Sequence, residues 1–374
     1  MKTNRIAVVT LCLLLAAGAA PFQAQEEKPQ AGFGEQVNVS EVLLDVLVTD
    51  KQGNVIIGLT PDDFVVEENG KPVELSNVSF YSNRRLLDAP DSLGELASGI
   101  DTKPQSRYFI LFFQEQQRVN ADLPELNLLK RQLEAARESR NWVKREKLLD
   151  DYVAIVSYDV KLKVQQDFTQ ENDLLLAAID RAASGKDPGA NWPSRMPDAG
   201  TVSLRANLPP GNELREKSTT VYEALQLLAR ATEDIVGRKN LIFFGTGVEL
   251  GQVAAFGLAK PDPRYWPATL QALNDHNVAV YTIDLAPGEI DYALASSMHQ
   301  LADETGGKYY WNFSNFLTPL KQVGSENSGY YLISYQATHP AGATGYQKVK
   351  VRLKNPEFKV KSREGYVYGT GSST

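Results

Sequence analysis

Cysteine and histidine are scarce in this sequence, and their scarcity removes several kinds of site. The 374 residues contain a single cysteine, Cys12, and three histidines that lie far apart, His276, His299 and His339. Cysteine-rich zinc sites, disulfide scaffolds and thiol catalysis are therefore excluded, and the case for histidine-based catalysis is thin.

The sequence patterns of common enzymes are missing as well. The chain has no G-x-S-x-G, H-E-x-x-H or S-x-x-K element, which are typical of familiar hydrolases. Gly245-Thr246-Gly247 follows a predicted strand, but the spacing to Gly251 is not that of a dinucleotide-binding turn. We expect a protein that is not an enzyme and that carries no cofactor.

An excess of positive charge is also lacking. Lysine and arginine together number 39 against 46 aspartates and glutamates, so the formal net charge is −7. Nucleic acids and anionic membranes attract basic surfaces, so this balance disfavours both as partners. The expected partner is a protein or a glycan.

The N-terminus has the order of segments found in a secretory signal peptide. Two basic residues precede the apolar run Ile6–Ala20, and small residues follow. The run is shorter than the roughly 20 residues of a comfortable membrane span, although an uncleaved N-terminal anchor is the alternative. We expect residues 1–24 to be a cleaved signal peptide and residues 25–36 a solvated linker. The mature chain is then secreted or periplasmic and has no membrane span.

Both ends of the remaining chain show the alternation of β-strands. Apolar residues alternate along Val37–Ser82, where Asn69-Gly70 between two extended runs is a strong hairpin signal, and Tyr330–Lys361 alternates in the same way. Neither segment is large enough to close a core alone. We therefore expect a split β-sandwich formed by residues 37–85 and 328–368.

The middle of the chain alternates strands with helices. Tyr108–Phe113 is a continuous apolar run typical of a buried parallel strand, and a helical stripe of leucines follows it. The alternation is interrupted by Asp187–Asn212, a stretch rich in proline and glycine that is too long for an ordinary connection. We expect an α/β domain over residues 105–325, with a doubly wound, mostly parallel sheet, inserted in the sandwich.

A doubly wound sheet binds ligands at the carboxyl ends of its strands, where the winding direction reverses. This point is expected between the first and fourth strands, whose following loops begin at Gln114 and Gly245. A third loop, Lys217–Thr220, is expected nearby. A cation site at this position requires carboxylates.

Several short motifs resemble those of a family of secreted bacterial proteins. They are Val46–Gly53, Gly58–Phe64, Glu68–Lys71, Gln166–Thr169, Gly237–Lys239, Ala302–Gly307 and Arg363–Tyr366. Their order and spacing from Val37 to Val367 are similar to those of the acidobacterial-type von Willebrand factor A-related family. The resemblance implies a von Willebrand A-like, Rossmann-like domain with a role in adhesion or protein binding.

The same resemblance implies where a metal site would lie. Von Willebrand A domains hold a divalent cation with an Asp-x-Ser-x-Ser loop, a threonine and a second aspartate, in a metal-ion-dependent adhesion site. Carried onto this sequence, these positions fall on Gln114, Gln116, Arg118, Thr219 and Thr246. Both carboxylates are missing and Arg118 adds a positive charge, so we expect a degenerate adhesion site without bound metal.

The hydroxyl at Thr219 has a second explanation. Thr220 and Glu223 have the spacing of a capping box, so a run of hydroxyl residues is expected at this helix start without any metal. A metal-dependent adhesion module with atypical ligands, and a scaffolding subunit of an envelope complex, are the alternative functions.

Partner recognition is expected at the rim of the same edge. Two loops carry aromatic and arginine side chains, which are the residue types that anchor partners: Trp192 and Arg195 in one, Tyr265 and Trp266 in the other. A loop that packs its own tryptophan is the other explanation. The sequence as a whole predicts a secreted, non-enzymatic binding protein of the adhesion type.

Overall fold

The structure is a computed structural model that describes residues 41–82, 106–114, 124–159, 161–184, 202–248, 261–286, 292–339 and 343–369. All of them belong to one compact unit, Val39–Thr374. The predicted signal peptide and linker, residues 1–24 and 25–36, lie outside the described residues. Among the helices of the described ranges, none is both long and apolar enough to cross a membrane.

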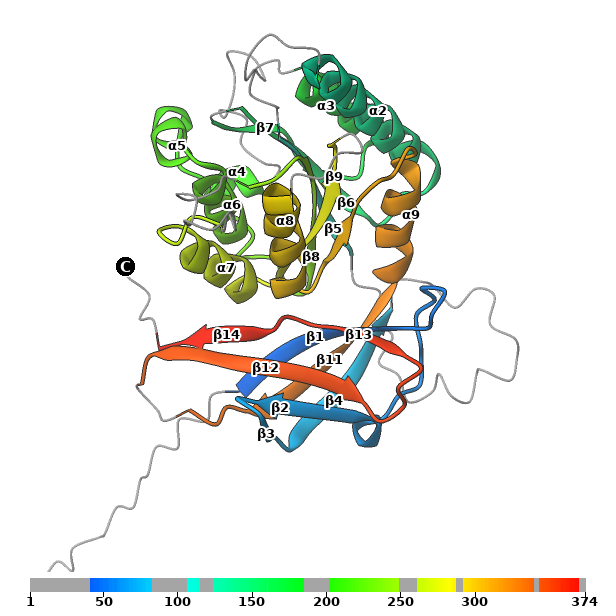
Figure 1. The fold of residues 1–374 in the computed structure, drawn as a ribbon, viewed down its shortest axis with the longest axis vertical. Coiled ribbons are helices and arrows are strands. Elements are labelled where there is room, and N and C mark those ends of the chain that lie inside the picture. Colours follow the sequence, from blue (N-terminus) through cyan, green and yellow to red (C-terminus); the bar gives the residue numbers. More distant parts are fainter. Residues whose placement is uncertain are drawn as a thin grey trace, which may run out of the picture. The chain divides into compact units, whose positions relative to one another are not determined.

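A six-stranded sheet forms the centre of the α/β part (Figure 1). Its strands are β5 (Tyr108–Gln114), β6 (Tyr152–Tyr158), β7 (Leu162–Thr169), β8 (Lys239–Gly245), β9 (Val278–Asp284) and β10 (Lys308–Tyr310). They are ordered β10-β9-β8-β5-β6-β7. Five strands are parallel, and β7 at the edge is antiparallel to β6. The chain therefore winds outward in one direction from β5 and then in the other from β8.

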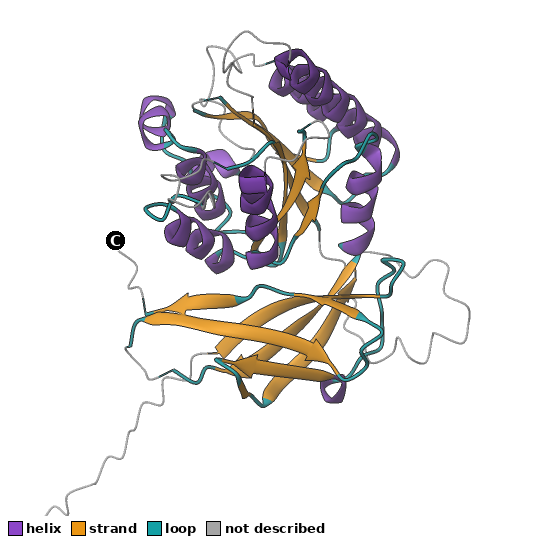
Figure 2. Cartoon of the chain, viewed as in Figure 1, coloured by secondary structure: helices purple, strands orange, loops and turns teal. Residues whose placement is uncertain are grey.

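Helices cover both faces of this sheet (Figure 2). One face carries α2 (Pro124–Arg145), α3 (Asn172–Ala183) and α9 (Leu317–Glu326), and the other carries α4 (Leu204–Asn207), α5 (Gly211–Lys217), α6 (Val221–Arg230), α7 (Trp266–Asp275) and α8 (Tyr292–Glu304). Along β5, Phe109 and Leu111 pack in the core beneath α2, α3 and α9. Ile110 and Phe112 pack in the core on the opposite face, beneath α4 to α8. This alternation follows from the two-residue period of a strand, and it explains why β5 is apolar throughout.

Part of the stretch predicted to be irregular is helical. Ser203 caps α4 by accepting a hydrogen bond from the Ala206 amide, and Asp167 of β7 accepts hydrogen bonds from the Ser203 hydroxyl at 2.6 Å and the Leu204 amide at 2.8 Å. A four-residue helix is too short to form by itself, so this contact with a distant strand supplies what the local sequence does not show. Residues 185–201 lie outside the described ranges.

Two four-stranded sheets make up the sandwich (Figure 1). The first is ordered β13-β1-β11-β4, from β13 (Lys359–Lys361), β1 (Glu41–Thr49), β11 (Gly329–Gln336) and β4 (Leu75–Ser82). The second is ordered β14-β12-β2-β3, from β14 (Gly365–Tyr368), β12 (Gly345–Leu353), β2 (Phe64–Glu68) and β3 (Lys71–Pro72), and the short helix η1 (Pro61–Asp63) precedes β2. Each sheet pairs strands from both ends of the chain. The predicted fold class, a doubly wound sheet inserted in a split β-sandwich, is confirmed.

Local pairing in the N-terminal segment differs from the expected run of strands. Asn69 and Gly70 form the predicted turn, with φ of 48° and 78°, and they join β2 to β3. The chain then leaves this sheet, because β4 pairs with β11 in the other one. Between β1 and η1, Val55 makes only an isolated bridge to Thr49. Burial of one face against a distant strand decided these pairings over sequence proximity.

Polar bonds join the sandwich to the edge of the α/β sheet where its parallel strands begin, which we call the amino edge. Arg363 donates to the Asn274 carbonyl at 2.7 Å and to the Leu43 carbonyl at 2.8 Å, so it links the end of α7 to β1. Asn277, just before β9, donates from its side-chain amide to Asp45 of β1. With the amino edge occupied by the sandwich, the opposite carboxyl edge is the one available for loops.

Candidate functional site

The carboxyl edge contains the point where the winding of the sheet reverses, between β5 and β8. These strands are paired up to Phe113 and Phe244, whose rings stack with centroids 4.8 Å apart. Gln114 and Gly245 follow directly. The sequence therefore predicted the correct pair of strands for the point where the winding reverses. Open α/β sheets bind ligands at such a point.

Gln114 lies against the backbone of the neighbouring strand. A Cβ atom built on Gly245 would approach Gln114 Oε1 to 2.3 Å and a ring carbon of Phe243 to 2.6 Å. Glycine at this position is what allows the amide side chain to lie beside the strand end. The first of the expected adhesion-site positions is thus occupied by a packed amide.

Thr219 is positioned by other contacts. Its hydroxyl donates to Glu223 Oε2 at 2.7 Å, and its carbonyl accepts a hydrogen bond from the Tyr158 hydroxyl at 2.9 Å. Thr220 and Glu223 form the predicted capping box at the start of α6. The hydroxyl therefore has a structural role in this helix start.

Of the remaining adhesion-site positions, Thr246 lies within the described residues. Thr246 directly follows β8 and is half-buried at the carboxyl edge. Gln116 and Arg118 lie outside the described residues, and so do Trp192 and Arg195 of the expected rim. Partner or metal binding by these positions stays a prediction.

A carboxylate that sequence reasoning did not select, Asp284, ends β9 beside Gly245. Its oxygens accept hydrogen bonds from the Ala286 amide at 2.7 Å and the Tyr309 hydroxyl at 2.8 Å, and the residue is 8% exposed. Burial raises its pKa, against the opposing effects of these two hydrogen bonds and of the nearby Arg131. Asp284 is therefore a buried carboxylate that is hydrogen-bonded through both oxygens and lies near the positive charge of Arg131.

Within the described ranges, no group of three or more histidine, cysteine, aspartate or glutamate side chains is arranged to hold a metal ion.

The carboxyl edge gains a positive charge from Arg131 of α2. Its Nε donates to the Leu285 carbonyl at 2.8 Å and its Nη2 donates to the Phe313 carbonyl at 3.0 Å. The guanidinium also lies 5.0 Å from the centroid of the Phe316 ring. Arg131 therefore fixes the loops after β9 and β10 to one helix.

The expected rim residues Tyr265 and Trp266 are packed rather than displayed. Trp266 is 9% exposed and belongs to the core on its face of the sheet, and Tyr265 stacks on Tyr222 with centroids 5.7 Å apart. The expectation of an exposed tryptophan is wrong at Trp266, because the ring fills the space between α6 and α7, where it also meets Tyr222 edge to face.

An exposed aromatic residue occurs elsewhere on the carboxyl edge. Trp311 directly follows β10 and is 52% exposed. The strand β10 ends at Tyr310, so Trp311 lies just outside the sheet. Asn312 next to it has a φ of 56°, which turns the chain at this point. A tryptophan just past the end of a short strand was the available signal.

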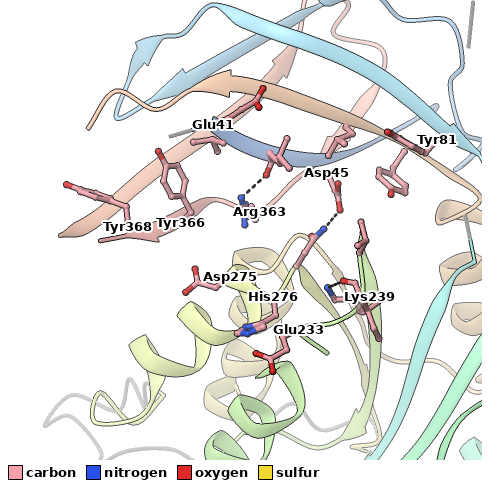
Figure 3. A pocket seen from close by; sticks show the side chains of 18 of the residues that line it. Glu41, Asp45, Tyr81, Glu233, Lys239, Asp275, His276, Arg363, Tyr366 and Tyr368 are labelled. Atoms are coloured by element: carbon pink, nitrogen blue, oxygen red, sulfur yellow. Dashed lines mark hydrogen bonds between the residues drawn. The ribbon is translucent and has the colours of Figure 1, made fainter. Parts of the chain in front are cut away.

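A second site lies between the amino edge and the sandwich, and we call it the amino-edge pocket (Figure 3). Its volume is about 670 Å³, within the range of ligand pockets. The lining residues come from β1, β4, β8, β11 and β14, from the turn after α6, from the end of α7 and the turn after it, and from the connections that carry His339 and Arg363. Sequence reasoning missed it because these segments are brought together only by the fold.

Three charged side chains line the inner part of this pocket, which we call its floor: Asp45 and Lys239 are buried, and Arg363 is half-buried. Burial raises the pKa of Asp45, and the Asn277 amide and nearby cations oppose that rise. Burial also lowers the pKa of Lys239 to about 8, and attraction to Asp45 compensates only in part. Arg363 likewise has its pKa lowered by burial. The floor is thus a set of opposite charges that partly neutralise one another.

Comparisons with known proteins give structural likeness only. No protein-family model matches this chain, and no curated protein matches its sequence. Three similar solved structures are BatB from Bacteroides thetaiotaomicron, the von Willebrand factor domain of the type V pili tip protein Mfa5 from Porphyromonas gingivalis, and a von Willebrand factor type A protein from Catenulispora acidiphila.

Each of these likenesses is distant. BatB has a TM-score of 0.35 at 15% identity, over 59% of this chain and 97% of that one. The Mfa5 domain has a TM-score of 0.37 at 12% identity, and the alignment covers 59% of this chain and 94% of that one. The Catenulispora protein has a TM-score of 0.38 at 8% identity, and the alignment covers 90% of this chain and 76% of that one. The sheet order described above is what establishes the fold.

Proposed function

We propose that this chain is a secreted or periplasmic, non-enzymatic interaction module that binds a protein or glycan partner at its carboxyl edge without a bound cation. The observation that carries the proposal is Trp311, a half-exposed tryptophan on a loop that the rigid sheet holds in place. Tryptophan is among the residues that contribute most to binding energy at interfaces. Its position on a loop over a rigid sheet makes Trp311 the residue at this edge best suited to anchor a partner.

The loop after β10 is held from several sides, which favours binding at low entropic cost. Arg131 donates to the Phe313 carbonyl, and Phe316 is fully buried in the core beneath. A residue whose neighbours are already fixed loses little conformational freedom when it binds. Trp311 is therefore presented on a prepared surface, as binding residues on loops over a rigid scaffold commonly are.

The metal-free form of the proposal rests on the charges at this edge. Gln114 replaces a carboxylate at the reversal point, Asp284 has both oxygens engaged, and Arg131 is a cation beside it. At an effective dielectric constant of about 20, two unit charges 4 Å apart interact by roughly 4 kcal/mol, so each missing carboxylate is a large loss for a divalent ion. A site assembled from atypical ligands is the alternative that a titration decides.

The partner is tested by a pull-down from envelope extract with the mature chain, its Trp311→Ala variant and Tyr346→Ala as the control. Tyr346 is 54% exposed but lies on β12 of the sandwich, so it matches Trp311 in exposure and differs in place. We expect Trp311→Ala to weaken partner retention at least tenfold, with Tyr346→Ala and added EDTA having no effect. Release by EDTA, or undiminished binding by Trp311→Ala, would contradict the proposal.

Metal binding is tested separately by calorimetry with millimolar Mg²⁺. The wild type should give no binding heat, and Gln114→Asp/Thr246→Asp serves as the variant with both carboxylates restored. Micromolar binding by the wild type would show an intact cation site.

N-terminal sequencing of the protein from cell fractions tests export. An intact Met1 on protein from the cytoplasm would contradict export and cleavage of the signal peptide.

A further inference from the structure

We propose that a single water molecule is bound in a small cavity at the amino edge, where it bridges the side chains of Arg238 and Asn240. We call this space the junction cavity. It is lined by residues just before β5, by the start of β8, by Asn327 after α9 and by Tyr330 of β11. Its volume is about 20 Å³, and one bound water requires roughly 10–15 Å³. The site does not depend on the function proposed for the carboxyl edge.

Two buried polar atoms of residues that line this cavity have no hydrogen-bond partner within the described residues. They are Nε of Arg238 and Oδ1 of Asn240. Arg238 is 7% exposed and Asn240 is 2% exposed, so bulk solvent does not supply the missing bonds. A buried polar atom without a partner lowers stability, and in native proteins such atoms are commonly paired with an ordered water.

The sequence places both side chains on one face of the sheet. Arg238 directly precedes β8 and Asn240 is the second residue of that strand, so the two-residue period of a strand turns them to the same side. Ile242 and Phe244 continue this series and pack in the core beneath α2, α3 and α9. The two unpaired atoms therefore belong to neighbouring positions of one row of side chains.

Other polar groups of both side chains hold them in place. Arg238 Nη2 donates to the Gly306 carbonyl at 2.6 Å and to the Tyr281 hydroxyl at 3.3 Å. Asn240 Nδ2 donates to the Tyr108 carbonyl at 3.4 Å. A carbonyl only accepts hydrogen bonds, so the amide must present its nitrogen to Tyr108, and its oxygen is the atom left over. Neither side chain can turn without breaking these bonds.

The two free atoms select the ligand by their chemistry. The Nε–H group of Arg238 is only a donor, and the amide oxygen of Asn240 is only an acceptor. A water molecule can accept from the first and donate to the second at once. An anion would leave the Asn240 oxygen unpaired and beside a like charge, whereas a cation would be repelled by the guanidinium. Water is therefore the ligand that satisfies both atoms.

A second arginine at the cavity shows the contrast. Arg107 also lines it, but its Nε and Nη2 donate to the two carboxylate oxygens of Asp151, both at 2.6 Å. Arg107 therefore needs no water, whereas Arg238 does. The bound water completes the bonding of the guanidinium that joins two of the sequence motifs, Gly237–Lys239 and Ala302–Gly307.

Nuclear magnetic resonance of the full chain tests the site in solution. In deuterated protein with protonated, nitrogen-15-labelled arginine, we expect the Arg238 Hε proton to show a cross-peak to water. The peak should have opposite signs in nuclear Overhauser and rotating-frame spectra, which proton exchange would not give. Arg107 Hε is the internal control and should show no such peak, because it faces Asp151. No peak at Arg238, or an equal one at Arg107, would overturn the proposal.

A high-resolution crystal structure grown in sodium bromide identifies the bound molecule. We expect density for one water within about 3.2 Å of both Arg238 Nε and Asn240 Oδ1, without an anomalous signal from bromide. Bromide at this position, or a cavity without density, would contradict the proposal. This measurement uses the wild type, so it does not depend on whether a substituted protein folds.

Asn240→Leu removes the accepting atom, and Asn274→Leu is its matched control. Asn274 is 5% exposed and its Nδ2 donates to the Glu304 carbonyl at 3.3 Å, so it resembles Asn240 in burial and bonding but does not line the cavity. The water cross-peak of Arg238 should be lost in Asn240→Leu and kept in Asn274→Leu. If both variants kept the peak, or both lost it, the bridge to Asn240 would be wrong.

Discussion

Raising the pH above 7.5 should stabilise this protein, and Lys239 is the reason. The side chain is 3% exposed, and burial lowers its pKa to about 8 from the usual 10.5. Between these two values the unfolded chain binds more protons than the folded chain, so the free energy of unfolding increases with pH. At 1.36 kcal/mol per pKa unit, Lys239 should add about 2 kcal/mol between pH 7.5 and 9.5.

Buried tyrosines set the upper limit of this increase. Burial raises the pKa of Tyr331 to about 12, and it also raises the pKa values of Tyr310, Tyr335 and Tyr366. Above pH 10 these hydroxyls ionise first in the unfolded chain, so the folded chain binds more protons and stability falls. The free energy of unfolding should therefore pass through a maximum between about pH 9 and pH 10.

Urea unfolding of the wild type, Lys239→Met and Lys51→Met between pH 7 and pH 11 measures both effects. Lys51 is an exposed lysine and serves as the control, so its variant should follow the wild-type profile. Lys239→Met should lose the rise below pH 9.5 and keep the fall above pH 10. If Lys239→Met retained the full rise, the assignment of this titration to the buried amine would be wrong.

Two pairs of substitutions, each a test variant with its control, examine the core of the α/β part. Asp151→Asn should destabilise by about 3–5 kcal/mol, because it breaks a buried two-bond pair with Arg107, whereas Asp180→Asn, in an exposed pair with Arg140, should cost less than about 1 kcal/mol. Gly307→Ala should cost about 3 kcal/mol, because its Cβ would lie 1.9 Å from the Val280 carbonyl oxygen. Gly324→Ala in α9, with its nearest contact at 3.4 Å, should be neutral or stabilising. Urea unfolding measures all four, and equal effects within either pair would contradict the packing described.

The sequence by itself determined the elements and their general layout. Continuous apolar runs such as Tyr108–Phe113 became buried parallel strands, because both faces of the strand are covered by helices. Asn69-Gly70 became a turn with positive φ, and Thr220 with Glu223 became a capping box. These features depend on a few neighbouring residues, so local chemistry is sufficient to specify them.

The tertiary structure decided which of those elements meet and which side chains remain exposed. Pairing of β4 with β11, capping of α4 by Asp167 and burial of Trp266 all depend on residues distant in the sequence. The same is true of both candidate sites: Trp311 is exposed because β10 ends at Tyr310, and the amino-edge pocket exists because both chain ends return to one sandwich. Long-range burial selects among alternatives that are equal in local energy, so it cannot be read from local pattern.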